Sequence, residues 1–121
     1  MFHPRLLEHF QNPRNAGELA DASVIVEMEN PICGDILKLW VKREGERVAA
    51  VRFKCRGCVA SMACGSALTE LVAGRPLVEL GGITPAVVEQ AVGELGAASK
   101  HAAVLAADTW KKTLAALARH K

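Results

Sequence analysis

The chain of 121 residues contains four cysteines, and cysteine is the residue type with the widest chemistry here. Three of them, Cys55, Cys58 and Cys64, lie in one short segment, KCRGCVASMAC, and the fourth, Cys33, lies in NPICGD. A thiolate binds soft metals and attacks sulfur. Because no secretory signal is visible, we expect a cytoplasmic protein in which these thiols stay reduced rather than form a disulfide framework.

Two of the cysteines occupy positions that favour reactivity. Cys33 lies in a turn in which Gly34 permits an otherwise strained backbone, and the carboxylate of Asp35 is close enough to share a site with that thiol. Cys58 follows Gly57 where a predicted strand meets a predicted helix, so free N–H groups and the helix dipole favour its thiolate. Cys58 is therefore the candidate sulfur-accepting thiol.

The other two cysteines fit a packing role. Cys55 alternates with Val51 and Phe53 on the inward side of a predicted strand, and helical geometry turns Cys64 away from Cys58 onto an apolar stripe. The competing interpretation pairs Cys55 with Cys58 as a Cys-x-x-Cys redox or zinc motif. A zinc knuckle usually needs a second such pair, and the sequence has none.

Hydrophobic spacing predicts the elements that must position these residues. The spacing has period 2 in three runs and a helical period before and after them. We expect a short helix at 3–10, strands at 23–28, 36–42 and 47–55, and helices at 59–73, 84–93 and 99–117. The prediction is a single α+β domain over residues 1–121, with a three-stranded antiparallel sheet packed against helices.

Charge and hydropathy exclude several classes of partner. The formal net charge is only +2 and the basic residues are scattered, so no nucleic-acid partner is expected, and no run is long and apolar enough for a membrane span. Three basic residues, Arg52, Lys54 and Arg56, share the outer face of the third predicted strand. They either protect the sheet and keep it soluble or form a docking surface for an acidic partner.

Four segments along the chain carry a resemblance to a known family. They are HFQNPRNAGEL near the start, NPICGD at 30–35, RFKCRGCVASMACGSALTELVAG at 52–74 and KHAAVLAAD at 100–108. Together, in order and over essentially the whole chain, they resemble the IscU/NifU N-terminal family of iron–sulfur cluster assembly scaffolds. The resemblance implies the same fold that the hydrophobic pattern predicts.

The resemblance also implies a ligand set for a transient [2Fe–2S] cluster or for zinc. The family uses three cysteines with an Asp and sometimes a His nearby. Carried over by position, the ligands are Cys33, Asp35, Cys58 and His101. The third family cysteine is replaced by Ala102. The hypothesis is that His101, or a mobile Cys64, compensates for it, and two sulfurs, one oxygen and one nitrogen suit tetrahedral Zn²⁺ or a labile cluster.

Plainer roles exist for two of these residues. Asp35 could be a turn residue that binds its own backbone, and His101 could be a histidine that only caps or solvates a helix start. The other histidines, His3, His9 and His120, have no partner at suitable spacing in the sequence.

The implied function is that of a binding and carrier protein, not an enzyme. A cysteine desulfurase would supply sulfur, and recipient proteins would take the cluster. A chaperone also serves the family, but the Pro-Pro-Val-Lys element that it recognises is absent, and LGAASK stands in its place. The alternatives are a zinc-dependent sulfur relay of the SufU type, whose usual insert between Cys58 and His101 is missing, and a degenerate metal-binding paralogue.

Overall fold

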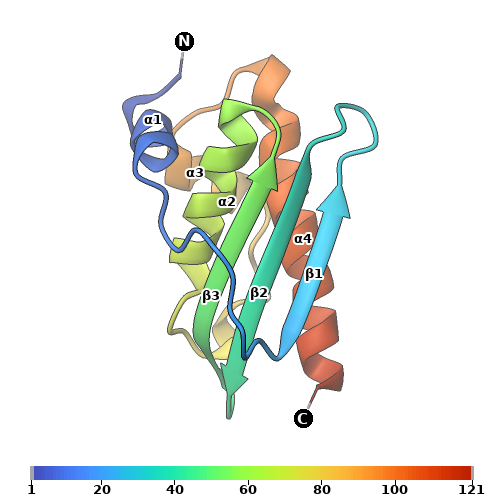
Figure 1. Cartoon of the computed structure of the whole chain (residues 1–121). Coiled ribbons are helices and arrows are strands. Elements are labelled where there is room, and N and C mark those ends of the chain that lie inside the picture. The colour runs from blue at the N-terminus through green and yellow to red at the C-terminus, as the bar shows by residue number, and fades with distance from the viewer. Residues whose placement is uncertain (1, 121) are drawn as a thin grey trace.

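The computed structural model describes residues 2–120 and has two layers, a sheet on one side and helices on the other (Figure 1). The sheet is three-stranded and antiparallel, in the order β1-β2-β3. The elements are α1 (Pro4–Gln11), β1 (Val24–Glu29), β2 (Ile36–Glu44), β3 (Arg47–Arg56), α2 (Val59–Val72), the 3₁₀ turn η1 (Leu77–Glu79), α3 (Pro85–Val92), the 3₁₀ turn η2 (Ala97–Ser99) and α4 (Lys100–Arg119). The predicted α+β fold is confirmed.

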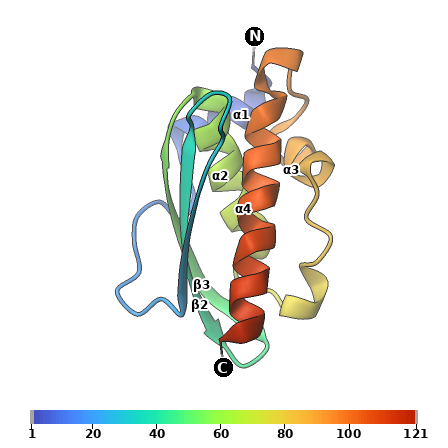
Figure 2. The ribbon, with the colours of Figure 1, turned by 90° about the vertical axis from the view of Figure 1, so that its right-hand side faces the viewer.

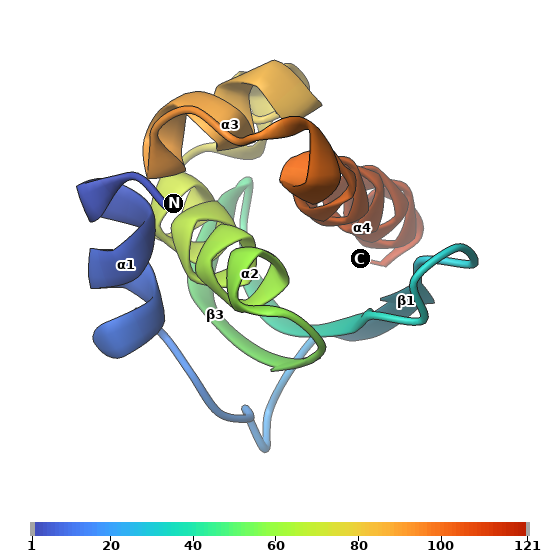
Figure 3. The same ribbon diagram turned by 90° about the horizontal axis from the view of Figure 1, so that it is seen from above.

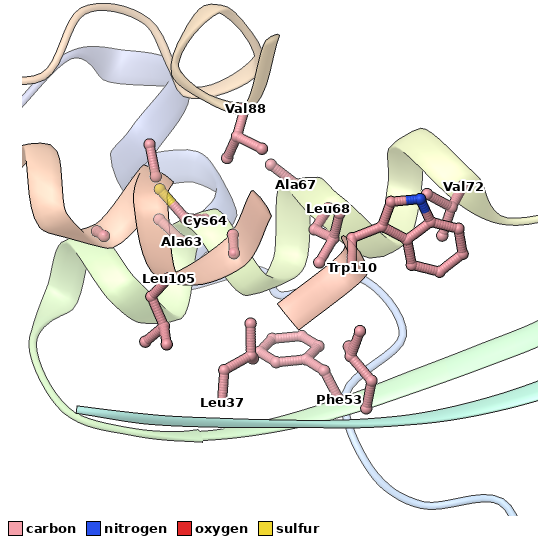
Figure 4. Close-up of a cluster of buried hydrophobic side chains, with 14 of the residues drawn as sticks. Leu37, Phe53, Ala63, Cys64, Ala67, Leu68, Val72, Val88, Leu105 and Trp110 are labelled. Atoms are coloured by element: carbon pink, nitrogen blue, oxygen red, sulfur yellow. The ribbon is translucent and has the colours of Figure 1, made fainter. Parts of the chain in front are cut away.

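The inner face of the sheet packs on α2 and α4, and the hydrophobic core lies between them (Figure 4). The alternation of β2 and β3 places every second side chain in this layer, and removal of that apolar surface from water drives the packing. Cys64 on α2 and Trp110 on α4 are both in the core, and the Trp110 indole donates a hydrogen bond to the Leu80 carbonyl at 2.9 Å.

The outer face of the sheet is less open than the sequence pattern predicts. Trp40 alternates with lysines on that face, yet it is only 5% exposed, and the Lys38 ammonium lies 5.0 Å from the centre of its ring. The loop after α1 runs along this side, opposite the helices (Figure 2), and Gly17 donates a backbone hydrogen bond to Phe53 at 2.9 Å. A long-range contact of this kind leaves no periodic signal in the sequence.

That loop also supplies acidic partners to the basic outer face. Glu18 binds Lys54 at 2.8 Å, and Asp21 binds Lys42 at 2.5 Å. Arg52 lies 3.4 Å from the side-chain oxygen of Asn15. Lys42 and Lys54 are therefore compensated within the chain, whereas Arg52 contacts only the neutral Asn15 amide; this partial compensation favours the protective role over a docking surface.

Three chain segments meet at one end of the molecule, where the strands β1 and β2 connect and where α2 and α4 begin (Figures 1 and 3). The register of β2 and β3 is decisive there, because Ile36 pairs with Arg56. The residues just beyond this pair, Asp35 and Gly57, are thereby brought together. Both strands extend further than the predicted strands do, and α4 is preceded by the turn η2, where a plain loop is predicted.

Within residues 2–120, no helix is long and apolar enough to cross a membrane.

Candidate metal centre

The turn that carries Cys33 is held by the side chain of Asn30. Its Oδ1 accepts hydrogen bonds from the backbone N–H of Ile32 at 2.9 Å and of Cys33 at 3.4 Å. Gly34 has a φ of +77°, in the left-handed region that glycine adopts at no steric cost, as predicted. The turn therefore presents the Cys33 thiol to solvent on a fixed backbone.

Asp35 ends that turn and points inward rather than toward its own backbone. It is only 7% exposed, and its Oδ2 accepts hydrogen bonds from the Ser61 hydroxyl at 2.6 Å and from the Cys58 N–H at 3.4 Å. Burial raises the pKa of this carboxyl, but the hydrogen bonds from Ser61, Cys58 and Cys33 outweigh burial and hold the pKa below its usual range. The turn role considered for Asp35 belongs to Asn30 instead.

Cys58 begins α2, as the sequence predicts. It is the N-cap residue, and its Sγ accepts a hydrogen bond from the backbone N–H of Ser61 at 3.4 Å, while the thiol donates to the Ser61 hydroxyl at 3.4 Å. The residue is exposed. Its Sγ lies 3.7 Å from Nε2 of His101, which comes from a different helix. Cys58 thus combines solvent access with a neighbouring imidazole.

His101 completes the cluster from the first turn of α4. Its Nε2 lies 3.5 Å from Oδ2 of Asp35. One donor atom each from Cys33, Asp35 and His101 all lie within 4.8 Å of one another, which is close enough for one metal ion to bind all three. The Cys58 thiol stands beside this group and contacts it through His101.

The donors suit a metal of intermediate softness. Two thiolates, one imidazole nitrogen and one carboxylate oxygen are all ligands that Zn²⁺ accepts in tetrahedral sites. Thiolates are the usual ligands of iron–sulfur clusters, and histidine replaces cysteine in some of them. The residues present therefore fit either zinc or a [2Fe–2S] cluster.

Cys55 and Cys64 are not brought to this group. Cys64 is fully buried in the core, and Cys55, on β3, is half-buried against it. Burial raises the pKa of each thiol to about 12. Both fit the packing role predicted for them, and a ligand role for Cys64 would need α2 to leave the core. Ala102, where the family has its third cysteine, is also buried.

Two residues of the centre were missed by sequence reasoning, Ser61 and Gly57. Ser61 binds both Asp35 and Cys58, and its only sequence signal is its place three residues after an N-cap, where a side chain can reach back. Gly57 lies directly against the carboxylate, and a Cβ at this position would collide with Cγ of Asp35. That contact follows from the strand register, which sequence alone does not fix.

The family model named NifU-like N terminal domain matches residues 1–121. The chain belongs to this family. Among relatives of this NifU-like domain, the iron–sulfur cluster assembly scaffold protein IscU 1 of Archaeoglobus fulgidus is 34% identical over 114 residues, which cover 94% of this chain and 74% of that protein. The zinc-dependent sulfurtransferase SufU of Bacillus subtilis is 38% identical over 77 residues, which cover 64% of this chain and 52% of that protein.

Solved structures agree with the fold of the NifU-like domain. The crystal structure of FiSufU, a SUF-system protein from Fervidobacterium islandicum, superposes with a TM-score of 0.75 at 18% identity, and covers 93% of this chain and 96% of that one. At this identity the likeness establishes the architecture alone.

The four thiols of this NifU-like domain should differ sharply in reactivity. We expect iodoacetamide at pH 8 to modify Cys33 and Cys58 in the native protein, because both are exposed. Cys55 and Cys64, whose pKa values burial raises to about 12, should react roughly 10³-fold more slowly than an exposed thiol of ordinary acidity. Peptide mass spectrometry over a time course measures the four rates, and all four thiols should react in urea. Modification of native Cys64 as fast as Cys33 would contradict its place in the core.

Gly57→Ala should weaken metal binding by the NifU-like domain, because the added Cβ displaces the Asp35 carboxylate. We expect about a 10–100-fold rise in the Kd for Zn²⁺, the usual cost of disturbing the support of a ligand. Competition with a chromophoric chelator measures it. Gly82→Ala is the control, since a Cβ there meets no heavy atom within 4 Å. Equal Zn²⁺ affinities for both variants would show that Asp35 is not a ligand.

Proposed function

We propose that the chain is a scaffold on which an iron–sulfur cluster is assembled and from which it passes to recipient proteins. The observation that carries the proposal is the convergence of Cys33, Asp35 and His101 within 4.8 Å beside the Cys58 thiol, at one exposed end of the fold. The family and the printed names of its relatives support it. We take residues 1–121 as one cytoplasmic domain that holds its cargo without catalytic turnover.

Sulfur would arrive as the persulfide of a cysteine desulfurase. In the proposed step the Cys58 thiolate attacks the outer sulfur of that persulfide. A new S–S bond forms at Cys58, the S–S bond on the desulfurase breaks, and the desulfurase cysteine leaves as a thiolate. Nε2 of His101, at 3.7 Å from Sγ, is placed to accept the Cys58 proton beforehand. Cys58 itself is exposed, which leaves its thiol accessible to a partner.

The mixed donor set also suits release. A carboxylate is a harder ligand than a thiolate and holds soft iron less firmly, so Asp35 and His101 would keep the cargo exchangeable. A structural metal site must retain its metal tightly, whereas a scaffold must release its cluster to a recipient protein. We therefore assign Cys33, Asp35, Cys58 and His101 as the ligands of the transient [2Fe–2S] cluster, with recipient proteins as its destination.

A zinc-dependent sulfur relay is the second candidate. The donor set completes a tetrahedral Zn²⁺ site without a third cysteine, and one relative is named a zinc-dependent sulfurtransferase. In that case Cys33, Asp35, Cys58 and His101 would hold zinc, and Cys58 would accept sulfur once a ligand from the partner protein had replaced it on the metal. The two functions share the site and differ in its cargo.

Anaerobic reconstitution with iron and sulfide tests the scaffold. We expect the wild type to develop the charge-transfer bands of a [2Fe–2S] cluster and to pass the cluster to an apo-ferredoxin. Cys58→Ser should lose the bands because a thiolate ligand is gone, whereas the control Cys55→Ser should retain them, since Cys55 lies outside the group.

Three outcomes would redirect or contradict the assignment. Bands that appear only in Ala102→Cys would mean that the present ligands do not suffice for a cluster. A wild type that purifies with about one Zn²⁺, builds no cluster and stimulates a cysteine desulfurase would establish the relay instead. Equal damage from Cys55→Ser and Cys58→Ser would contradict the division between reactive and packing thiols.

A further inference from the structure

Ser61 makes contacts that a helix residue does not need for its helix. It lies in the first turn of α2 and is only 2% exposed. Its hydroxyl donates to Oδ2 of Asp35 at 2.6 Å and accepts a hydrogen bond from the Cys58 thiol at 3.4 Å. One hydroxyl therefore contacts one atom of each of two side chains of the cluster.

The hydrogen bond to Asp35 restricts how the carboxylate can turn. Oδ2 also accepts the N–H of Cys58 at 3.4 Å, so two donors from α2 converge on the same oxygen. A carboxylate has about four lone-pair sites. Both donors bind the same oxygen that lies 3.5 Å from Nε2 of His101, so Oδ2 faces the imidazole while α2 holds it. The rest of the carboxylate lies against Gly57, where the chain leaves no room for a Cβ.

We propose that Ser61 is a positioning residue of the metal centre, which fixes the Asp35 oxygen and the Cys58 sulfur relative to one another. The inference rests on the proposed function only in that the centre binds metal. Its hydroxyl competes with the metal for the electron pairs of the carboxylate, and it holds the carboxylate in a single geometry. Ser61 thereby sets both the geometry of the Asp35 ligand and how readily its carboxylate dissociates from the metal.

α2 also offers a matched control. Ser66, on the same helix, is fully buried and its hydroxyl also makes two hydrogen bonds, with His9 Nδ1 and from the N–H of Arg14, both at 2.8 Å. Those contacts join α2 to α1 and its loop and do not touch the cluster. Ser66→Ala therefore removes an equally buried serine hydroxyl without altering the support of Asp35.

The test measures the binding of Zn²⁺ and Co²⁺ to the full chain in the wild type, Ser61→Ala and Ser66→Ala. We expect Ser61→Ala to raise the Kd for Zn²⁺ about 10–100-fold and to change the ligand-field bands of bound Co²⁺, which report the geometry of the donors. Ser66→Ala should leave both unchanged, although both variants should unfold at lower urea concentration than the wild type. The spectrum separates positioning from stability, because lost stability alone does not move the bands of the folded protein.

Each other result overturns a defined claim. A Ser61→Ala variant with the Zn²⁺ affinity and Co²⁺ spectrum of the wild type would refute the positioning role, and so would equal effects in Ser66→Ala. A wild type that binds Zn²⁺ and Co²⁺ but builds no cluster would contradict the scaffold function and leave the positioning result standing. If the wild type binds neither ion, the cluster of residues is not a metal centre, and the inference is refuted as well.

Discussion

The buried contact between the Asp35 carboxylate and the start of α2 is the constraint on which the site depends. An ionised carboxyl is costly to bury unless donors surround it, and here Ser61 and the N–H of Cys58 provide them. That requirement ties the β1–β2 turn to the helix that carries Cys58. The antiparallel register makes the contact possible, because pairing Ile36 with Arg56 places Asp35 beside Gly57. A shift of the register by one residue would point the carboxylate to the other face of the sheet.

Local chemistry in the sequence predicted a large part of this arrangement. The change from period 2 to a helical period around Gly57 placed Cys58 at a helix start, and alternation along β3 turned Cys55 inward. The positive φ at Gly34 was likewise predictable, since few other residues tolerate it. His101 is different: its candidacy came from resemblance to a family, because a single histidine in an alanine-rich helix carries no pattern of its own.

What the sequence could not predict involves contacts between distant segments. The loop after α1 runs along the sheet and donates the Gly17 N–H to the Phe53 carbonyl, and the pairing of Lys54 with Glu18 follows from the same path. The role of Ser61 requires the strand register and the helix position together. Hydrophobic periodicity describes which way a side chain faces along its own element. It does not say which element will lie opposite.

The order of the donors along the chain has a consequence for the protein as it is made. Cys33, Asp35 and Cys58 leave the ribosome well before His101, which begins α4. The core is equally incomplete until then, because α4 packs on β1, α2 and α3. A nascent chain thus offers all four thiols and Asp35 before the imidazole has been added. Packing of α4 onto the core and arrival of His101 at the centre are therefore the same late event, because one helix supplies both.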